Sequence, residues 1–362
     1  MRILYGVVGE GMGHAIRSSV ILEHLRLMGH DMRIVASGRA VNFLNERHPD
    51  VVIPITGLSL VYRDNMVSTI RTAIQNIRSV TGVPSNVLKY LQTAQDFQPD
   101  VVITDFESWS YWFARGTGVP VISVDNMQII NRCSHPESMI QQDARSFQLA
   151  RNIVRAKVPK CNAFMITTFF FPPVSRERTT LHPPILRPRI LEAKDRVSTG
   201  SHVLVYQTGT SHQALIDELK QVDVPFRVYG LLRDIQEDHV DHNLTFRPFS
   251  QDGFVEDLAT CSSVISGGGF TLMGEAVFLG KPMLSIPVSN QFEQVLNARY
   301  LEALEFGQMA RHVTAEGVGA FLSRRDRYAE KLQSFEHDRN AGFVKELEGR
   351  MTAAVAEGSL SP

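Results

Sequence analysis

Short apolar runs alternate with longer helical patterns along the first half of the chain. A helical pattern runs from Ile16 to Leu27 and stops at Gly29, and another lies in the aromatic-rich stretch FESWSYWFARGTG. Strands that alternate with helices of this length predict an α/β fold with a parallel, doubly wound sheet. The apolar runs that we interpret as strands are RILYGVV, DMRIVAS, PDVVITD and GVPVISV.

The same alternation restarts after residue 200, with five further strand candidates: HVLVYQT, PFRVYG, NLTFRPF, SVISGG and KPMLSIP. Between the halves lies the stretch FFFPPVSRERTTLHPPILRPRI, whose prolines disfavour regular structure and favour an extended connection. We therefore predict two Rossmann-like domains, over 1–170 and 199–325, joined by a linker over 171–198. Residues 326–362 read as charged C-terminal helices.

Composition narrows the class of protein. The chain has 362 residues, of which 43% are hydrophobic and 21% charged, which is ordinary for a globular protein with two cores. Its formal net charge of −1 gives no reason to expect a nucleic-acid partner. The three cysteines are far apart, and no apolar stretch approaches 18 residues. We expect a cytoplasmic protein.

The stretch SVISGGGFTLMGEAVFLGKPMLSIPVSNQFEQVLNA carries the richest chemistry. A predicted strand ends at Ser266, and the glycines 267–269 then turn into a helix. Such a turn exposes backbone N–H groups at a helix N-terminus, which favours a diphosphate. Glu275 lies inside that helix, where a carboxylate can accept two hydrogen bonds from a ribose diol. The polar loop SNQFEQ follows the next strand, where ligands bind in open α/β sheets.

This order of features resembles the nucleotide-sugar motif of GT-B glycosyltransferases. The similarity is to family 28, which includes the peptidoglycan N-acetylglucosaminyltransferase, and to the small-molecule UDP-glycosyltransferases. The resemblance implies that the C-terminal helices cross back to the first domain. It also implies that the phosphates lie near Gly267, Gly268, Gly269, Phe270 and Thr271, the ribose at Glu275, and the donor sugar at Glu293 and Gln294. The alternative is an ordinary turn with a buried helix glutamate and a solvated loop.

The opening stretch MRILYGVVGEGMGH gains a meaning from the same resemblance. In the inverting small-molecule transferases, a histidine after a glycine-rich loop is the general base, and His14 matches it. In the alternative interpretation, His14 is structural or only forms hydrogen bonds. Gly11 and Gly13 would then only shape the cleft.

A base histidine is often oriented by a carboxylate. Asp105 ends a predicted strand, level with the loop before His14, and Glu107 is a second candidate. Asp105 has two other interpretations: an N-cap of the next helix, or a contact to the acceptor. Arg17, one turn after His14, either touches an acidic acceptor or faces solvent, and solvent is favoured.

Two further donor contacts follow from the resemblance. Thr210, in the loop TGTS after the first strand of the second half, approaches the donor phosphates, although the loop also suits an ordinary turn. Phe249 lies where the family packs the nucleobase, and a core phenylalanine explains it almost as well. There is no D-x-D between strands and no H-x-x-x-H. We therefore expect no metal site and no cofactor apart from the nucleotide sugar, as in GT-B enzymes.

Two basic stretches, over 66–82 and 144–160, are candidates for peripheral contact with a membrane. Helices that face the core with a solvated basic side explain them more simply.

These observations predict an inverting, metal-independent glycosyltransferase. It would move a sugar from a nucleotide sugar, with UDP favoured, to a hydroxyl of a small-molecule or lipid-linked acceptor. Two alternatives stay open: a hydrolysing UDP-sugar 2-epimerase, and a non-catalytic protein that binds a nucleotide sugar or a lipid. One sequence does not name the acceptor.

Overall fold

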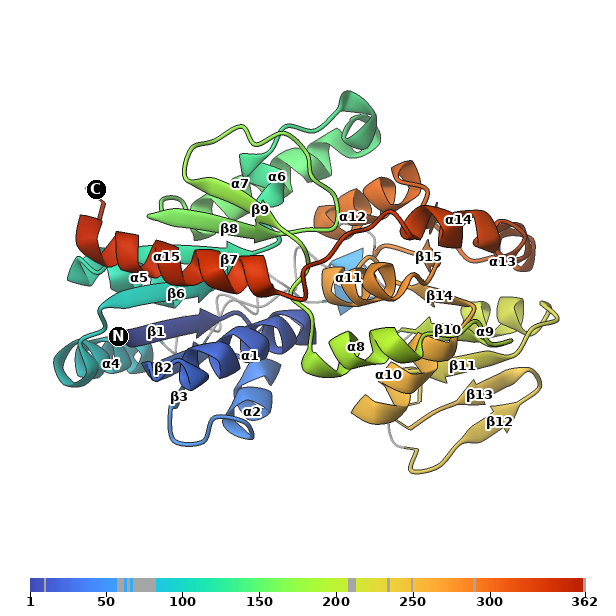
Figure 1. Cartoon of the computed structure of the whole chain (residues 1–362), viewed down its shortest axis with the longest axis horizontal. Coiled ribbons are helices and arrows are strands. Elements are labelled where there is room, and N and C mark those ends of the chain that lie inside the picture. Colours follow the sequence, from blue (N-terminus) through green and yellow to red (C-terminus); the bar gives the residue numbers. More distant parts are fainter. Residues whose placement is uncertain are drawn as a thin grey trace.

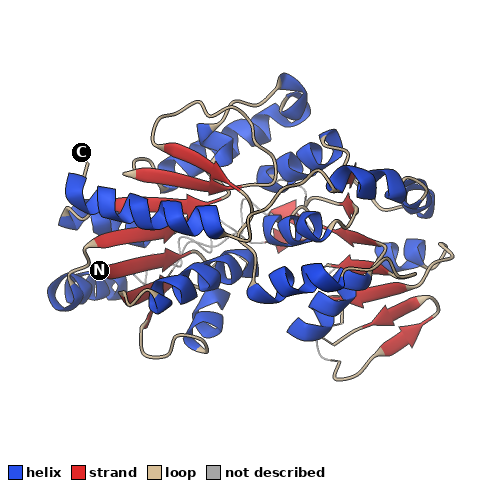
Figure 2. Cartoon of the chain, in the orientation of Figure 1, coloured by secondary structure: helices blue, strands red, loops and turns tan. Residues whose placement is uncertain are grey.

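Two seven-stranded sheets form the centres of the two halves of the chain, as the computed structural model shows (Figure 1). The structure describes residues 1–9, 11–56, 62–63, 66–67, 83–207, 213–232, 235–248, 250–288 and 291–360. Helices cover both faces of each sheet (Figure 2). The doubly wound architecture predicted from the alternation of apolar runs is confirmed.

The first sheet has the strand order β3-β2-β1-β6-β7-β8-β9, and all of its neighbouring strands are parallel. The four apolar runs of the first half form β1, β2, β6 and β7, and their side chains are nearly all buried. The strands are β1 (Arg2–Val7), β2 (Asp31–Ala36), β3 (Val52–Pro54), β6 (Val101–Asp105), β7 (Val121–Asp125), β8 (Ala163–Thr167) and β9 (Thr179–His182). A separate antiparallel pair consists of β4 (Tyr62–Arg63) and β5 (Met66–Val67).

The helices of this half follow the strands as a doubly wound fold requires. None of the helices in the described part of the chain has both the length and the apolar character needed to cross a lipid bilayer. The helices are α1 (Met12–Leu27), α2 (Arg39–Asn45), α4 (Val83–Gln92), α5 (Ser108–Thr117), α6 (Ile129–Arg132) and α7 (Ala144–Lys157).

The second sheet has the order β12-β13-β11-β10-β14-β15-β16, in which only the β12–β13 pair is antiparallel. Its strands are β10 (Val203–Tyr206), β11 (Phe226–Tyr229), β12 (His239–Asp241), β13 (Leu244–Phe246), β14 (Ser263–Ser266), β15 (Met283–Ser285) and β16 (Gly307–Met309). Its helices are α9 (Gln213–Leu219), α10 (Gln251–Thr260), α11 (Phe270–Leu279), α12 (Phe292–Ala303), α13 (Ala315–Leu322) and α14 (Arg325–Leu332).

The stretch predicted as an extended linker, 171–198, holds regular structure. Strand β9 pairs in parallel with β8, and α8 (Pro188–Ala193) follows it. Proline does not prevent either element, because the four residues of β9 contain none and Pro188 occupies the first turn of α8, where no hydrogen-bonded N–H is needed. The prediction of irregular structure here was therefore wrong, and the division of the chain at these boundaries stays a prediction.

The last helix, α15 (Ala341–Glu357), lies along the first sheet although the chain has just left the second (Figure 1). It contacts β6, β7 and β8. The predicted return to the first domain is confirmed for α15, whereas α14, which the prediction included, packs in the second half, where Tyr328 stacks on Phe321. The side chains that α15 adds to the core of this half are Phe343, Leu347, Met351 and Ala354.

An apolar seam joins the two halves. One core cluster combines Ile130 and Phe169 of the first half with Phe270 and Leu296 of the second. The ring of Phe170 stacks on that of Tyr300 in α12, with 4.0 Å between centroids. Burial of this surface fixes how the two sheets face each other, and so fixes the site between them.

Candidate active site

The site begins where β1 and β6 end side by side. These strands pair in register, with Val7 opposite Asp105. The glycine-rich turn after β1 and the carboxylate at the end of β6 therefore lie at the same edge of the sheet, which is where open α/β sheets bind ligands. The prediction that Asp105 lies level with the loop before His14 is confirmed.

His14, in the first turn of α1, contacts this carboxylate directly. Its Nδ1 lies 2.7 Å from Oδ1 of Asp105. The Asp105 side chain is fully buried, and the imidazole keeps 15% of its side-chain surface exposed. A buried acid that holds one ring nitrogen fixes the orientation of the imidazole and leaves Nε2 for another partner.

The hydrogen bonds of Asp105 and Glu107 show which acid is the partner of His14 and which is the cap of the next helix. Glu107 is the N-cap of α5, because its carboxylate accepts hydrogen bonds from the backbone N–H groups of Trp109 and Ser110. Asp105 is not the cap, and Glu107 is not the partner of His14. Burial raises the pKa of Glu107 even though these two hydrogen bonds oppose the shift.

Arg17 does not face solvent, so the favoured prediction for it was wrong. Its residue is only 2% exposed. Its Nε lies 3.1 Å from Oδ2 of Asp105, and its Nη2 lies 2.5 Å from Oδ1. The hydroxyl of Ser18 donates to the same carboxylate over 2.8 Å. One helical turn after His14 places Arg17 on the buried face of α1, and the charge of Asp105 makes burial of the guanidinium tolerable.

The charge state of Asp105 follows from these partners. Burial alone would raise the pKa of its carboxyl, but the charge of Arg17, together with His14, outweighs burial and holds the pKa below its usual value. Asp105 is therefore ionised near neutral pH. Since an ionised carboxylate only accepts hydrogen bonds, Nδ1 of His14 carries the proton in this contact.

The two glycine turns touch each other. Gly11, at φ +93°, is the N-cap of α1, and this conformation is strained for any residue with a side chain. A Cβ on Gly13 would lie 2.8 Å from Oγ1 of Thr271, which donates a hydrogen bond to the Gly13 carbonyl over 3.3 Å. The N-terminal ends of α1 and α11 therefore meet at one place between the sheets.

The turn before α11 has the form that the sequence predicts. Gly269 is its N-cap, and among the described residues no side chain caps this helix end. A Cβ on Gly268 would meet the backbone of Gln294 at 2.5 Å, so only glycine fits. The amide of Asn297 donates to the Gly268 carbonyl over 3.1 Å and so ties α12 to the turn. The unpaired N–H groups at this end form an anion site in principle.

Glu293 and Gln294 have different surroundings. The carboxylate of Glu293 accepts hydrogen bonds from the amides of Asn126 and Asn297, at 2.7 and 2.5 Å. Burial raises its pKa, against the effect of the hydrogen bond from Asn297. Gln294 accepts at its Oε1 a hydrogen bond from the backbone N–H of Val288, in its own half of the chain. Of these two residues, Glu293 is the one whose described hydrogen bonds reach the other half.

Glu275 has a partner that the sequence does not predict. Arg187, the N-cap residue of α8, donates from Nε and Nη2 to the two carboxylate oxygens, over 2.7 and 2.8 Å. Burial raises the pKa of Glu275 although the charge of Arg187 opposes the shift. A ribose diol would have to share these oxygens with Arg187 or displace it. The ribose role stays a prediction.

Sequence reasoning missed Asn126 and Arg187. Asn126 directly follows β7, so the rule that ligands meet the carboxyl ends of parallel strands would have selected it. No local signal marks Arg187, because its partner lies 88 residues away. Two predicted donor residues, Thr210 and Phe249, and most of the basic stretch 66–82 lie outside the described residues. Within the described part, no three His, Cys, Asp or Glu side chains form a group that could hold a metal ion.

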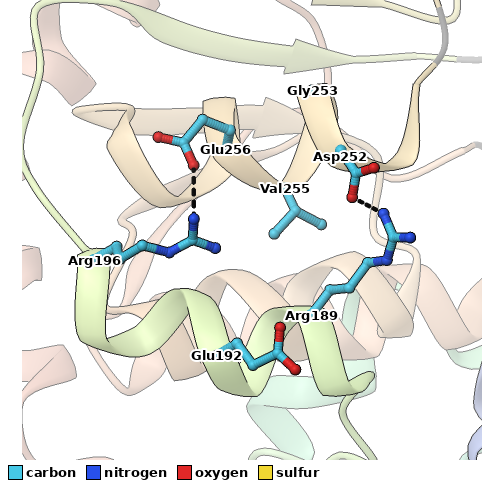
Figure 3. Close-up of a pocket in the computed structure, with 7 residues that line it drawn as sticks. All are labelled: Arg189, Glu192, Arg196, Asp252, Gly253, Val255 and Glu256. Carbon is cyan, nitrogen blue, oxygen red and sulfur yellow. Dashed lines mark ion pairs between the residues drawn. The ribbon is translucent and has the colours of Figure 1, made fainter.

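A pocket of about 590 Å³ lies between α8 and α10, and none of its lining residues is a predicted site residue (Figure 3). Its cations pair with acids across the gap: Arg189 with Asp252, and Arg196 with Glu256. Because its two arginines face three acids, with Glu192 as the third, this pocket does not suit an anionic ligand such as a diphosphate, and it shares no residue with the site of His14.

Comparison with known sequences gives a family. The family model described as "Glycosyl transferase family 1" matches residues 1–325. An uncharacterized glycosyltransferase of Methanosarcina mazei is 23% identical over 344 residues, which cover 88% of each chain. The UDP-N-acetylglucosamine-N-acetylmuramyl-(pentapeptide) pyrophosphoryl-undecaprenol N-acetylglucosamine transferase 3 of Bacillus cereus is 23% identical over 195 residues, 47% of this chain and 54% of that protein.

Solved structures give the fold. A UDP-glucose: anthocyanidin 3-O-glucosyltransferase in complex with UDP has a TM-score of 0.68 at 14% identity and covers 97% of this chain and 99% of its own. The glycotransferase of kitacinnamycin has a TM-score of 0.65 at 17% identity, with 98% of each chain covered. MurG of Acinetobacter baumannii has a TM-score of 0.61 at 15% identity, covering 96% and 99%. The predicted GT-B fold is confirmed.

Proposed function

This chain belongs to glycosyl transferase family 1, and from that premise we propose that it performs an inverting, metal-independent transfer of a sugar from a UDP-sugar to an acceptor hydroxyl. The observation that carries the proposal is the contact between His14 and the buried, ionised Asp105, beside the point where the N-termini of α1 and α11 meet. A base and an anion site adjoin there, as a displacement reaction requires.

His14 acts as the general base in this proposal. Asp105 holds Nδ1–H, so Nε2 accepts the proton of the acceptor hydroxyl as its oxygen attacks the anomeric carbon. The bond from that carbon to the diphosphate oxygen breaks on the opposite face, which inverts the configuration. Asp105 stabilises the imidazolium that forms.

The departing diphosphate carries its charge to the N-terminus of α11. Gly268, Gly269 and Thr271 supply backbone N–H groups there, and Gly267 and Phe270 complete the turn. Preorganised N–H donors and the helix dipole stabilise charge that develops in the transition state without a metal ion. We expect full activity in the presence of EDTA, and loss of activity that is restored by a divalent cation would contradict this part.

The donor assignment rests on similarity as well as on chemistry. Two relatives carry UDP in their names or are in complex with it: the Bacillus cereus transferase and the anthocyanidin glucosyltransferase. The acceptor is proposed as a small molecule or a lipid-linked molecule, because the same relatives name one of each kind.

The test is a panel of UDP-, dTDP- and GDP-sugars. Each is first screened for thermal stabilisation of the protein, since a ligand that binds only the folded state raises its melting temperature. The best donor is then incubated with trial acceptors, and the anomeric configuration of the product is read by NMR. Equal turnover of the UDP-, dTDP- and GDP-sugars, or retention of the anomeric configuration, would contradict the proposal. Conversion of the sugar without acceptor would favour the alternative, a hydrolysing 2-epimerase.

Helix α7 supports a proposal of peripheral membrane contact. Leu149 and Ile153 are 56% and 46% exposed, and the basic side chains of Arg145, Arg155 and Lys160 are exposed near them along the chain. Apolar side chains among basic ones suit an anionic bilayer surface. We expect sedimentation with phosphatidylglycerol vesicles, weaker sedimentation with phosphatidylcholine vesicles, and loss of both in the Leu149→Glu/Ile153→Glu variant. Equal sedimentation of that variant would contradict the contact.

A further inference from the structure

Arg17 contacts three polar groups from one buried position on α1. Its Nε and Nη2 bind Asp105, its Nη1 donates to Oδ1 of Asn126 over 3.1 Å, and its Nη2 lies 3.0 Å from Nδ1 of His14. The planar guanidinium presents these donors in a fixed fork, which a lysine does not reproduce. Arg17 thus fixes the position of the Asp105 carboxylate and lies beside the imidazole of His14.

The contact with His14 is electrostatic. Because Nδ1 donates its proton to Asp105, it has no lone pair left to accept an N–H of Arg17. Arg17 therefore acts on His14 through the position of the carboxylate that holds its ring.

Asn126 links Arg17 to the other half of the molecule by two hydrogen bonds. Its Oδ1 accepts from Arg17, and its Nδ2 donates to Oε1 of Glu293 over 2.7 Å. Each end of the amide meets a group of the matching polarity, so its orientation is determined. Glu293 lies on α12, in the half that holds the α11 turn. A chain of hydrogen bonds thus runs from Glu293 through Asn126 and Arg17 to the acid that holds His14.

We propose that Arg17 is a positioning residue for His14: it holds Asp105, the partner of the imidazole, in place, and is itself held by Glu293 of the second half through Asn126. The proposal rests on the proposed function, in which His14 is the base. It assigns a role to an arginine that touches neither sugar nor phosphate in that scheme.

Other charged groups also face this cluster. Asp105 approaches from β6, Asp125 from β7, Tyr5 from β1 and Glu293 from α12. Asp125 is occupied by the hydroxyl of Ser123 and the backbone N–H of Gln128. Burial raises the pKa of both Asp125 and Tyr5. Asp105 is thus the acid whose charge Arg17 chiefly balances.

The first test replaces the charge. For Arg17→Gln, we expect kcat/KM near neutral pH to fall roughly ten- to hundredfold, with the donor KM nearly unchanged, as when a group that orients a functional imidazole is lost. The acidic limb of the pH profile should move up by about one pH unit, because Asp105 loses the charge that chiefly holds its pKa low and is then protonated at a higher pH. For Arg17→Lys, which keeps the charge, the limb should stay near its original place while the rate stays low.

The second test separates the link to the other half. Asn126→Ala keeps the guanidinium and removes its anchor, so a smaller loss of kcat/KM without a shifted limb is expected. Arg26→Gln is the matched control on the same helix, because Arg26 is exposed and its ion pair within the described part of the chain is with Glu23, three residues away. Normal pH profiles in both Arg17 variants, with loss of stability alone, would overturn the proposal.

A readout without turnover distinguishes this proposal from the function. In protein labelled with ¹⁵N-histidine, the His14 signals are identified by their loss in His14→Asn. We expect the Nδ1–H tautomer in the wild type, and a mixture of the two tautomers in Arg17→Gln, where Asp105 is no longer held in place. If no donor is turned over, the proposed function fails while these signals still decide the role of Arg17. Unchanged signals in Arg17→Gln would refute it.

Discussion

The two strand–glycine–helix turns, one between β1 and α1 and the other between β14 and α11, look alike in sequence, but the acids buried beside them have pKa values shifted in opposite directions. Beside the first turn, Asp105 is buried against a cation and an imidazole, and its pKa is lowered. In the second, the acid Glu275 is buried against Arg187, and its pKa is nevertheless raised by burial. The same local motif therefore lies beside an acid whose cation outweighs the effect of burial in one half, and beside an acid whose cation offsets burial only in part in the other.

The difference teaches what each turn is suited to do. The acid beside the first turn has its two charged partners, Arg17 and His14, in its own half, so its chemistry depends on the imidazole that it holds. The second presents backbone N–H groups at a helix end, and its acid has a single cationic partner that comes from the segment between the halves. Transfer of a proton fits the first turn, and binding of a nucleotide sugar fits the second.

The largest expected effect is on kcat, which depends on the first turn through His14. His14→Ala should lower kcat roughly 10²–10⁴-fold and leave donor affinity nearly unchanged, because it removes only the base. Steady-state kinetics and donor titration by calorimetry measure the two quantities. His24→Ala is the control, since His24 lies in the same helix and pairs with Glu348 of α15. A near-normal rate would remove His14 as the base.

The next effect concerns donor affinity. If the ribose binds Glu275, then Glu275→Gln should raise the donor KM by about tenfold or more with little change in kcat, because uniform binding is lost. Selectivity between UDP- and dUDP-sugars should shrink in the same variant. Unchanged KM and selectivity would show that Glu275 serves only to hold Arg187, and the second turn would then bind phosphate alone.

A smaller effect tests the contact between the turns. A Cβ on Gly13 would meet Oγ1 of Thr271, so Gly13→Ala should destabilise the protein by about 1–3 kcal/mol, as overpacking does. Thr271→Ala removes the oxygen that is met, and the double variant should recover part of the loss. Urea unfolding of the four proteins gives the coupling energy. Additive losses would mean that the two turns do not touch in solution.

The smallest effect is a change in the pH dependence of stability. Glu275 has a raised pKa in the folded protein, so its contribution to the free energy of unfolding is largest below the ordinary value of about 4.3 and falls as the pH rises towards the folded value. Asp105, whose pKa is lowered, contributes above its ordinary value of about 3.9 and loses that contribution in acid.

The same urea experiment checks this contrast. Between pH 4 and pH 6, Glu275→Gln should gain stability relative to the wild type as the pH rises. A relative loss over that range would mean that Arg187 lowers the pKa of Glu275 more than burial raises it.

Local pattern was enough for the frame of the fold. Alternating apolar runs and helices gave nine strands in two parallel sheets, because buried parallel strands must be nearly continuous in apolar residues. Five strands of the two sheets were missed: β3, β8, β9, β12 and β16. All but β8 are only three or four residues long, which is too short to carry a clear pattern. The glycine turns, His14 and Asp105 were found because ligand sites in this fold lie at strand ends, which a sequence marks directly.

The sequence by itself determined the frame of the two sheets and their glycine turns, and it marked His14 and Asp105 as candidates for a pair, which the structure then showed in contact. Only the tertiary structure decided that Arg17 is buried on that acid, that Glu107 caps α5, that Arg187 occupies Glu275, and that Asn126 joins Glu293. The reason is physical. Strand ends and helix starts are local features, whereas the partner of a buried charge is whatever side chain the packing of distant segments brings within hydrogen-bonding reach.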